Sequence, residues 1–381
     1  MRTCLQFAKL TRNASKLLIS QRIGVNTLQR RCLTTRASHT SWSFSWKAGA
    51  VLTASGVAVS LASLKSMTAR QLADNTGTPP QYTPSRSVRS ESDQTGLKFT
   101  LYQYQTCPFC CKVRALLDFY GFSYDVIEVN SVWRTQIKWS TYKKVPILVV
   151  EGKEGFMQLN DSSLIISLLE SFLENKSESL KKLHSYYPGL EGPNEKGKIV
   201  LDYPNRYFIM FGDNKPPRTA DELKEERKWR KWADDVLVHM LSPNVYRSPR
   251  EALQAFRYFS DVGEWEKNFS NSERLVVIYV GAAAMYILGK VLKRRYKLKD
   301  DVRESLYDAC DDFVKGLGKN RKFVGGDVPN LGDLAVYGVL TSIEGCDAFQ
   351  DLWKNTKIKK WYGEMKTAVN QHQGSRKLAS G

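Results

Sequence analysis

Three of the seven cysteines in this 381-residue chain lie within five residues, at Cys107, Cys110 and Cys111. The first two form a C-P-F-C motif, which has three chemical interpretations: half of a zinc site, a redox-active dithiol, or a single activated thiolate with a neighbouring thiol. A structural zinc site needs four ligands, usually from two close pairs. Cys310 and Cys346 are isolated, and no two histidines have the spacing of zinc ligands. Zinc is therefore disfavoured, and thiol chemistry is favoured.

The surrounding residues predict that the motif stands where a strand turns into a helix. Leu97–Tyr104 is apolar and rich in aromatic residues, as in a buried strand. Pro108–Tyr120 has apolar residues at helical spacing and a proline in its first turn. The helix start stabilises an anion at Cys107 and lowers a thiol pKa from ~8.5 into the range ~3.5–7.5. Cys107 is therefore the predicted thiolate, and Cys110 can resolve a mixed disulfide.

The neighbours of these two cysteines have simpler expected roles. Lys112 and Arg114 are expected either to add positive charge near Cys107 or to point into water. Cys111 is interpreted as a structural neighbour. The elements expected after this helix are a strand, a helix, two strands and a helix, at residues 122–130, 131–142, 145–150, 155–160 and 161–173. This order within about 80 residues is the thioredoxin-like arrangement, the context that makes a C-x-x-C motif informative.

Two further stretches predict a glutathione site. The Val145–Pro146 peptide is expected to be cis and to face the cysteine, so that the Val145 backbone pairs with the cysteinyl unit of glutathione. Asp161 can bind the ammonium of the γ-glutamyl group, while Ser162 and the helix N–H groups bind its carboxylate. Helix capping alone would also explain Asp161 and Ser162. Their combination with C-P-F-C and V-P favours glutathione.

The net charge of +18 is concentrated at the N-terminus, where the first 73 residues contain no Asp or Glu. The remainder is only mildly basic, so nucleic acid is not an expected partner. The acid-free start has the composition of a mitochondrial transit peptide. The uncharged run 48–64 is at the lower length limit of a membrane span, which makes it either a weak single-pass anchor or part of a removed presequence. The predicted organisation is a targeting-like segment, an anchor, a linker, a thioredoxin- or glutaredoxin-like domain, an insertion and a helical domain, at residues 1–47, 48–64, 65–96, 97–175, 176–220 and 221–375.

The second half of the chain is predicted to be helical. The insertion before it has turn residues that favour a small hairpin. The apolar stretch 274–298 is expected to be a buried core helix with a solvated basic end. Asn330 and Asp333 predict a reciprocal helix cap. His239 is expected to be packed rather than to bind a ligand.

These motifs resemble the glutathione transferase superfamily. C-P-F-C, K-V-P-I-L-V and Q-L-N-D-S-S stand in the first half, and G-G-D-V-P-N-L-G-D-L-A-V-Y-G stands in the second. Longer strings over residues 97–362 resemble the membrane-associated prostaglandin E synthases within it. The resemblance implies an α/β plus all-α fold class: a thioredoxin-like domain followed by a glutathione-transferase-like helical domain. Ordinary glutathione transferases activate the thiol with Tyr or Ser, so C-P-F-C departs from them and favours this branch.

The resemblance also implies an activity, the isomerisation of the endoperoxide prostaglandin H2 to prostaglandin E2. Cys107 would be the thiolate, Tyr104 would donate a hydrogen bond to it or to oxygen, and Phe109 would line an apolar substrate pocket. Glutathione would be held by Val145, Pro146, Asp161 and Ser162. Haem bound through the glutathione sulfur is implied by the resemblance alone, and that form would break the endoperoxide down.

Two other functions stay open. A glutathione-dependent thiol–disulfide oxidoreductase would give Cys110 a role that isomerisation does not require. A membrane-tethered module that binds glutathione or haem would need no turnover. For location, the resemblance implies a Golgi membrane form with a clipped soluble cytoplasmic form, whereas the N-terminal composition favours mitochondria. A homodimer is a further open expectation.

Overall fold

The computed structural model describes residues 68–70, 81–152, 155–193, 197 and 199–379. The chain divides into two compact units, Met1–Gln71 with Pro188–Pro204 and Leu72–Tyr187 with Asn205–Gly381. In the first unit, the described residues form an antiparallel sheet in the order β1-β7-β8, with bounds Thr68–Arg70, Gly189–Pro193 and Ile199–Asp202. Strands β7 and β8 confirm the hairpin predicted in the insertion. The predicted targeting-like segment and the run 48–64 lie outside the described residues.

The second unit is built around a five-stranded sheet in the order β2-β4-β3-β5-β6. The bounds of these strands, in chain order, are Arg86–Val88, Lys98–Gln103, Tyr124–Glu128, Ile147–Gly152 and Gly155–Asn160. Strand β3 is parallel to β4 and antiparallel to β5, and β6 is antiparallel to β5. Strand β2 lies within the segment predicted to be a linker, and it pairs with β4. Its three residues are too few to show a periodic pattern in the sequence.

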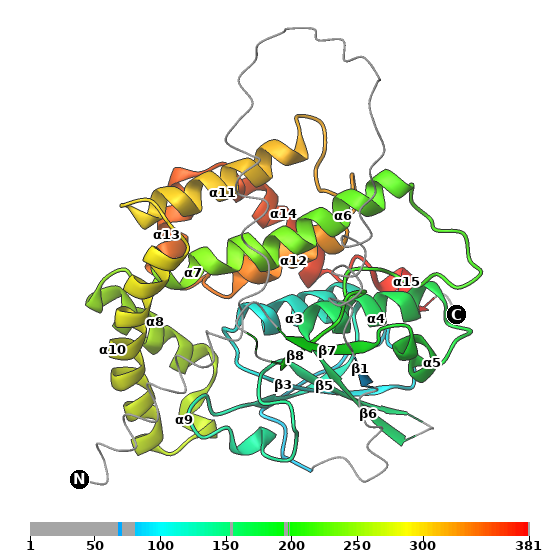
Figure 1. Cartoon of the computed structure of the whole chain (residues 1–381), viewed down its shortest axis with the longest axis horizontal. Coiled ribbons are helices and arrows are strands. Elements are labelled where there is room, and N and C mark those ends of the chain that lie inside the picture. Colours follow the sequence, from blue (N-terminus) through cyan, green and yellow to red (C-terminus); the bar gives the residue numbers. More distant parts are fainter. Residues whose placement is uncertain (1–67, 71–80, 153–154, 194–196, 198, 380–381) are drawn as a thin grey trace, which may run out of the picture. The chain divides into compact units, whose positions relative to one another are not determined.

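Helices α3 (Pro108–Tyr120) and α4 (Ser162–Glu174) lie between this sheet and the helices of the second half (Figure 1). Helix α3 buries ten of its 13 residues, because it packs on the sheet on one side and on α12 on the other. Gly121 ends it in the left-handed conformation with φ of 74°, where glycine is favoured. The short helix α5 (Leu180–Ser185) follows α4. This arrangement confirms the thioredoxin-like fold and the α/β plus all-α class.

The predicted helix at residues 131–142 is wrong. Only a 3₁₀ turn, η1 (Thr135–Ile137), forms there. The Asn130 side chain accepts hydrogen bonds from the N–H groups of Val132 and Trp133, at 2.9 and 3.1 Å. Arg134 then adopts a left-handed conformation with φ of 51°. These local side-chain bonds compete with helix formation, and amphipathic spacing does not reveal them.

The second half is helical, as predicted. Its elements are α6, η2, α7, α8, α9, α10, α11, α12, α13, α14 and α15, with bounds Ala220–Trp232, Ala233–Leu237, Val238–Val245, Pro249–Val262, Trp265–Asn268, Asn271–Arg295, Val302–Leu317, Leu331–Thr341, Asp347–Asn355, Ile358–Asn370 and Ser375–Ala379. The segment η2 is a π-helical turn between α6 and α7. Such turns displace side chains from the regular helical pattern and are frequent at functional sites.

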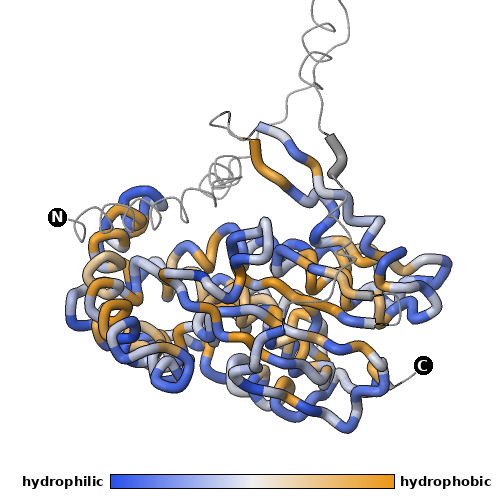
Figure 2. The backbone as a smooth tube through the Cα atoms, turned by 90° about the horizontal axis from the view of Figure 1, so that it is seen from below, coloured by the Kyte–Doolittle hydropathy of each residue, from blue (hydrophilic) through white to orange (hydrophobic). Residues whose placement is uncertain are grey.

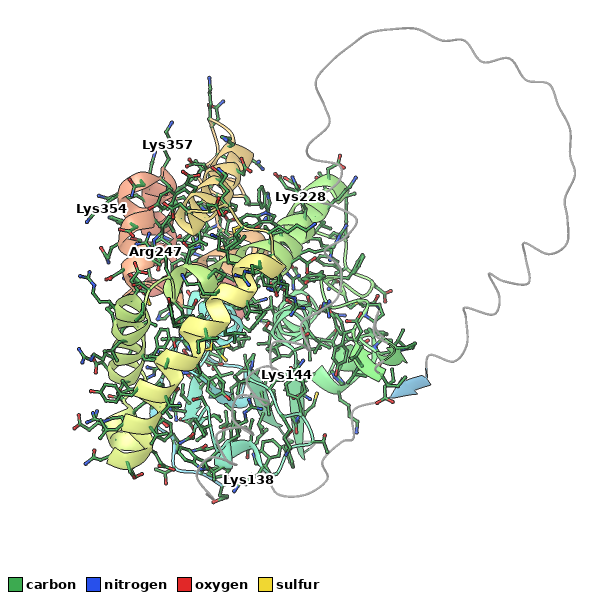
Figure 3. The ribbon with its side chains drawn as sticks, turned by 60° about the vertical axis from the view of Figure 1, so that its left-hand side comes forward. Lys138, Lys144, Lys228, Arg247, Lys354 and Lys357 are labelled. Carbon is green, nitrogen blue, oxygen red and sulfur yellow. The ribbon has the colours of Figure 1, made fainter. Side chains whose placement is uncertain are left out.

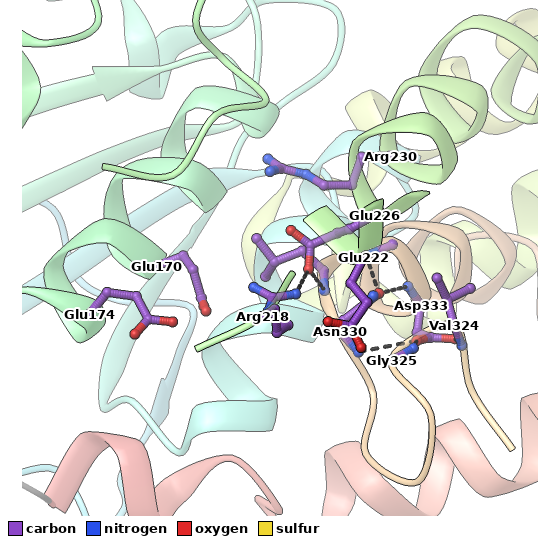
Figure 4. Close-up of polar contacts among 12 residues, drawn as sticks. Glu170, Glu174, Arg218, Glu222, Glu226, Arg230, Val324, Gly325, Asn330 and Asp333 are labelled. Carbon is purple, nitrogen blue, oxygen red and sulfur yellow. Dashed lines mark hydrogen bonds and ion pairs between the residues drawn. The ribbon is translucent and has the colours of Figure 1, made fainter. Parts of the chain in front are cut away.

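The start of α12 confirms the predicted cap. The Asn330 side chain accepts hydrogen bonds from the N–H groups of Gly332 and Asp333, and Asp333 accepts one from the Asn330 N–H at 3.1 Å. Asp333 is fully buried and also accepts from the N–H groups of Val324 and Gly325 and from the indole of Trp361 (Figure 4). This carboxylate therefore joins the helix start, the preceding loop and α14.

The prediction that the stretch 274–298 is a buried core helix is wrong. It forms α10, but only 28% of its apolar window is buried. Figure 2 shows the hydrophobic residues of α8 and α10 gathered on one side of the second unit. His239 is packed as expected: its ring stacks on Tyr296 with centroids 4.3 Å apart. Burial lowers the pKa of His239.

Candidate functional site

Cys107 is the N-cap residue of α3, where an extended backbone (φ −75°, ψ 123°) turns into the helix. Its N–H donates to the Tyr104 carbonyl at 3.0 Å, and its carbonyl accepts from the Cys111 N–H at 2.8 Å. Pro108 follows at the first helical position, where the missing N–H costs nothing. Cys107 is partly exposed, whereas Cys110 is fully buried. The strand-to-helix corner thus presents one accessible thiol and one buried thiol.

The two thiols have opposite electrostatic roles. A hydrogen bond from Cys110 lowers the pKa of Cys107, and although burial opposes this, the backbone N–H groups of Cys110 and Phe109 and the charge of Arg114 lower it further. The pKa of Cys110 is raised well above its ordinary value, first by burial and then by its bond to Cys107. Cys107 is therefore the thiolate and Cys110 the protonated donor.

Tyr104 packs beside Cys107 in a cluster of buried side chains that includes Cys110 and Val145. Burial raises the pKa of Tyr104 to about 12, although the guanidinium of Arg134 opposes this rise. The phenol is thus protonated at neutral pH and available as a hydrogen-bond donor. Arg134 was not singled out in the sequence, because its place depends on the left-handed turn after β4.

The sheet register brings the predicted glutathione residues next to each other. The Val145–Pro146 peptide is cis, as predicted. Ile147, the next residue, pairs with Asn160 at the end of β6, and Asp161 follows directly. Val145 is mostly buried and belongs to the cluster that Cys107 and Tyr104 contact. The cis peptide and the start of α4 therefore lie side by side.

Asp161 does cap α4, which was the alternative explanation for it. Its Oδ1 accepts from the N–H groups of Ser163 and Leu164, at 2.9 and 3.1 Å. Asp161 has a φ of 70°, a conformation that is rare outside glycine and common where function imposes strain. Its Oδ2 lies 3.8 Å from an Nη of Arg206, a residue of the insertion that the sequence did not indicate. Capping uses one carboxylate oxygen, and the other faces a cation.

Lys112 neither points into water nor adds charge at Cys107. Its side chain is 1% exposed, and its ammonium pairs with Asp234 of η2 and donates to the Ser163 hydroxyl at 3.1 Å. Asp234 also accepts from Ser163 and from Tyr207, at 2.6 and 2.9 Å. This network joins α3, the start of α4 and the helical half. A pairing across 122 residues leaves no pattern in the sequence.

Arg114 is also buried rather than solvated. It donates to the Gln103 side chain, and to the Gln105 carbonyl and the Cys111 sulfur at 2.6 and 3.1 Å. Burial raises the pKa of Cys111 to about 11, in agreement with a structural role. Arg114 and Cys111 line a cleft of about 340 Å³ together with residues of α12 and α14. Cys107 and Phe109 do not line this cleft, so the predicted substrate pocket at Phe109 stays a prediction.

Comparison with known proteins follows from this geometry. The glutaredoxin family matches residues 99–154, which run from β3 through the C-P-F-C corner to the end of β5. A relative from Danio rerio, named prostaglandin E synthase 2, is 49% identical over 292 residues, 75% of each chain. A Mus musculus relative of the same name is 47% identical over 289 residues, 75% of this chain and 74% of the relative. The chain belongs to the prostaglandin E synthase 2 family.

Solved structures of more distant proteins are also similar to this family member. Glutathione S-transferase III in its apo form covers 73% of this chain with 96% of its own, at a TM-score of 0.40 and 14% identity. Glutathione transferase F7 from Populus trichocarpa covers 73% of this chain with 99% of its own, at a TM-score of 0.40 and 13% identity.

Proposed function

We propose that this protein isomerises prostaglandin H2 to prostaglandin E2 with the Cys107 thiolate. The observation that carries the proposal is the hydrogen-bonded Cys107–Cys110 pair at the start of α3, in a chain 49% identical to a named prostaglandin E synthase 2. A thiolate favoured at neutral pH is a strong nucleophile toward a weak O–O bond. The pair supplies it in an accessible position.

The isomerisation balances without an external oxidant or reductant. The Cys107 thiolate attacks the oxygen on C9, forming an S–O bond while the O–O bond breaks. The oxygen on C11 leaves as an alkoxide and takes a proton, which the Tyr104 phenol is placed to supply. A base then removes the C9 proton, the C–H electron pair becomes the second C9–O bond, and the S–O bond breaks. The thiolate returns, and the product has a 9-keto and an 11-hydroxy group.

The residues around the cis peptide fit glutathione. The Val145 backbone, fixed by cis-Pro146, presents an edge that can pair with a cysteinyl backbone. Ser162 is the first residue of α4, so the N–H groups at this helix start favour a carboxylate, while Asp161 favours the ammonium. Bound glutathione supplies a second thiol beside Cys107. Haem stays an implication of the resemblance, and no step here depends on it.

The test is product analysis with the full chain freed of haem and supplied with prostaglandin H2. We expect prostaglandin E2 well above spontaneous decay, and we expect Cys107→Ser to reduce it to the level without protein. Cys111→Ser is the matched control and should keep wild-type turnover, because Cys111 bonds to Gln105 and Arg114 away from the corner. A wild-type product mixture equal to spontaneous decay would contradict the proposal.

A second function is favoured by Cys110 itself. A buried thiol bonded to a partly exposed thiolate is also the arrangement of a dithiol oxidoreductase. Glutathione-dependent disulfide reduction by the dithiol route requires the Cys110 sulfur, whereas isomerisation requires only a donor at that position. Cys110→Ser should therefore abolish dithiol reduction and keep most isomerisation. Loss of both activities would show that the second sulfur is part of the isomerase.

The remaining expectations are proposals of the same kind. We keep the membrane anchor at 48–64, the predicted domain boundaries and the homodimer as expectations for this chain. The Golgi and mitochondrial locations are alternatives, which imaging of the full chain with an intact N-terminus would separate.

A further inference from the structure

Helix α10 is packed in the reverse of the usual sense, with small residues inward and large apolar residues outward. A Cβ at Gly281 would lie 2.4 Å from the Phe256 ring of α8, and one at Gly289 would lie 3.4 Å from the Tyr246 backbone. Ala282 is 5% exposed on the same side. These residues allow α10 to approach α7 and α8 closely. The large apolar residues are therefore not needed for packing within the chain.

The outward face carries a continuous apolar stripe. Five residues spaced four apart form it, and we call them the outer stripe: Leu275, Tyr279, Ala283, Ile287 and Val291. The four large members are 48%, 54%, 64% and 55% exposed, and Val276 beside them is 41% exposed. At 1.5 Å per residue the stripe is about 24 Å long. Figure 3 shows α10 in yellow, with no other described helix or strand in front of it.

The charges on α10 are distributed unevenly. Basic residues gather at the C-terminal end, at Lys290, Lys293, Arg294, Arg295 and Lys297. No acidic residue lies between Leu275 and Arg295, and Glu273 at the other end is used in the helix cap. The outward face is thus apolar over most of its length and cationic at one end.

This combination matches a lipid surface better than a protein partner. Lys290 lies within the stripe, next to Val291, and lysine is depleted from the cores of protein interfaces. At a membrane, a lysine stem contacts the apolar boundary while its ammonium reaches the headgroups. A spanning orientation is excluded for the folded unit, because the inward side of α10 is packed on α7 and α8.

We propose that the outer stripe of α10 lies on an anionic lipid bilayer, with its apolar side chains at the headgroup–acyl boundary and its basic end on the phosphates. The helix then lies parallel to the membrane surface. This contact is separate from the predicted segment 48–64, and it does not depend on the proposed reaction. Each basic residue near an anionic surface should strengthen binding about fivefold.

The test uses the full chain and vesicles of phosphatidylcholine and phosphatidylserine that contain a diazirine-labelled acyl chain. After photolysis, peptide mass spectrometry locates the labelled residues. We expect label at Tyr279, Ile287 and Val291, and a decrease when phosphatidylserine is replaced by phosphatidylcholine. Val328 is 56% exposed and lies away from α10, so it is the internal control and should stay unlabelled. The readout is local, so membrane binding elsewhere in the chain does not produce it.

Matched variants complete the test. The double variant Ile287→Gln and Val291→Gln should reduce α10 labelling about tenfold, Arg294→Gln about fivefold, and Val328→Gln not at all. All four positions are exposed, so the fold should be retained, as circular dichroism would verify. The proposal is overturned if vesicle-bound protein carries no label on α10, or if Val328 is labelled equally. It is also overturned if sedimentation without lipid shows a dimer that the double variant dissociates, because a second copy would then cover the stripe.

Discussion

Helices α3 and α12 begin in the same unit but treat their first N–H groups in different ways. At α12, the side chains of Asn330 and Asp333 bond reciprocally to the helix start, and Asp333 alone accepts four hydrogen bonds. At α3, the N-cap residue is Cys107, whose side chain forms no capping hydrogen bond. Its sulfur instead lies near the N–H groups of Phe109 and Cys110, which stabilise its charged form.

This difference separates stability from chemistry. A helix start that is fully satisfied by buried groups contributes to folding and has no capacity left for a substrate. A helix start that faces an exposed sulfur keeps its N–H groups and dipole for a thiolate. We expect substitutions at α12 to change the free energy of unfolding and substitutions at Cys107 to change turnover.

The largest effect is expected at Cys107. Cys107→Ser should bring turnover to the level without protein, while the free energy of unfolding should stay within about 0.5 kcal/mol of wild type, because the site is partly exposed and makes no cap. Denaturant unfolding beside product analysis measures both. A loss of several kcal/mol would show that Cys107 also holds the fold.

The next effect tests whether α3 contributes stability one turn later. Lys112→Met should destabilise the protein by about 3–5 kcal/mol, because it leaves Asp234 buried without its cation. The double variant Lys112→Met and Asp234→Asn should recover part of this loss. Denaturant unfolding of the two variants gives the coupling energy. If the single variant costs less than about 1 kcal/mol, Lys112–Asp234 is not a joint between the two halves.

At α12 a smaller loss is expected, with no direct effect on chemistry. Asp333→Ala should destabilise the protein by about 3 kcal/mol, because several buried donors lose their acceptor. Asp327→Ala, at an exposed position in the same loop, is the control and should stay within about 0.5 kcal/mol of wild type. Turnover per folded molecule should stay unchanged at 25 °C. A changed rate would mean that α12 positions the site through its contact with α3.

The same comparison explains how far the sequence was informative. Cys107, the cis peptide at Val145–Pro146 and the cap at Asn330 depend on neighbours in the chain, so residue types and spacing predicted them. Arg134 depends on an Asn130 turn that replaced a predicted helix. Asp234 reaches the site through a π-helical turn and a pairing distant in sequence.

Helix α10 shows a different limit of the sequence. Its apolar composition predicted a helix, but composition does not say which face another element covers. Small residues on one face and large ones on the other look like a buried helix when only the mean is considered. The covered face is set by α7 and α8, which lie outside the stretch itself.

The smallest expected effect measures what Cys110 adds to the start of α3. A thiol or hydroxyl at this position can donate to the Cys107 thiolate, whereas a methyl group cannot. Cys110→Ala should therefore raise the pKa of Cys107 by about one unit, the equivalent of one hydrogen bond, and Cys110→Ser should raise it less. Because the thiolate is the active form, turnover falls as pH falls through the Cys107 pKa. The midpoint of this fall should move to higher pH in the alanine variant. Thiolate absorbance titration against a Cys107→Ser blank measures the pKa directly. Equal midpoints in wild type and both variants would mean that the helix start alone, through its N–H groups and dipole, sets the pKa of Cys107.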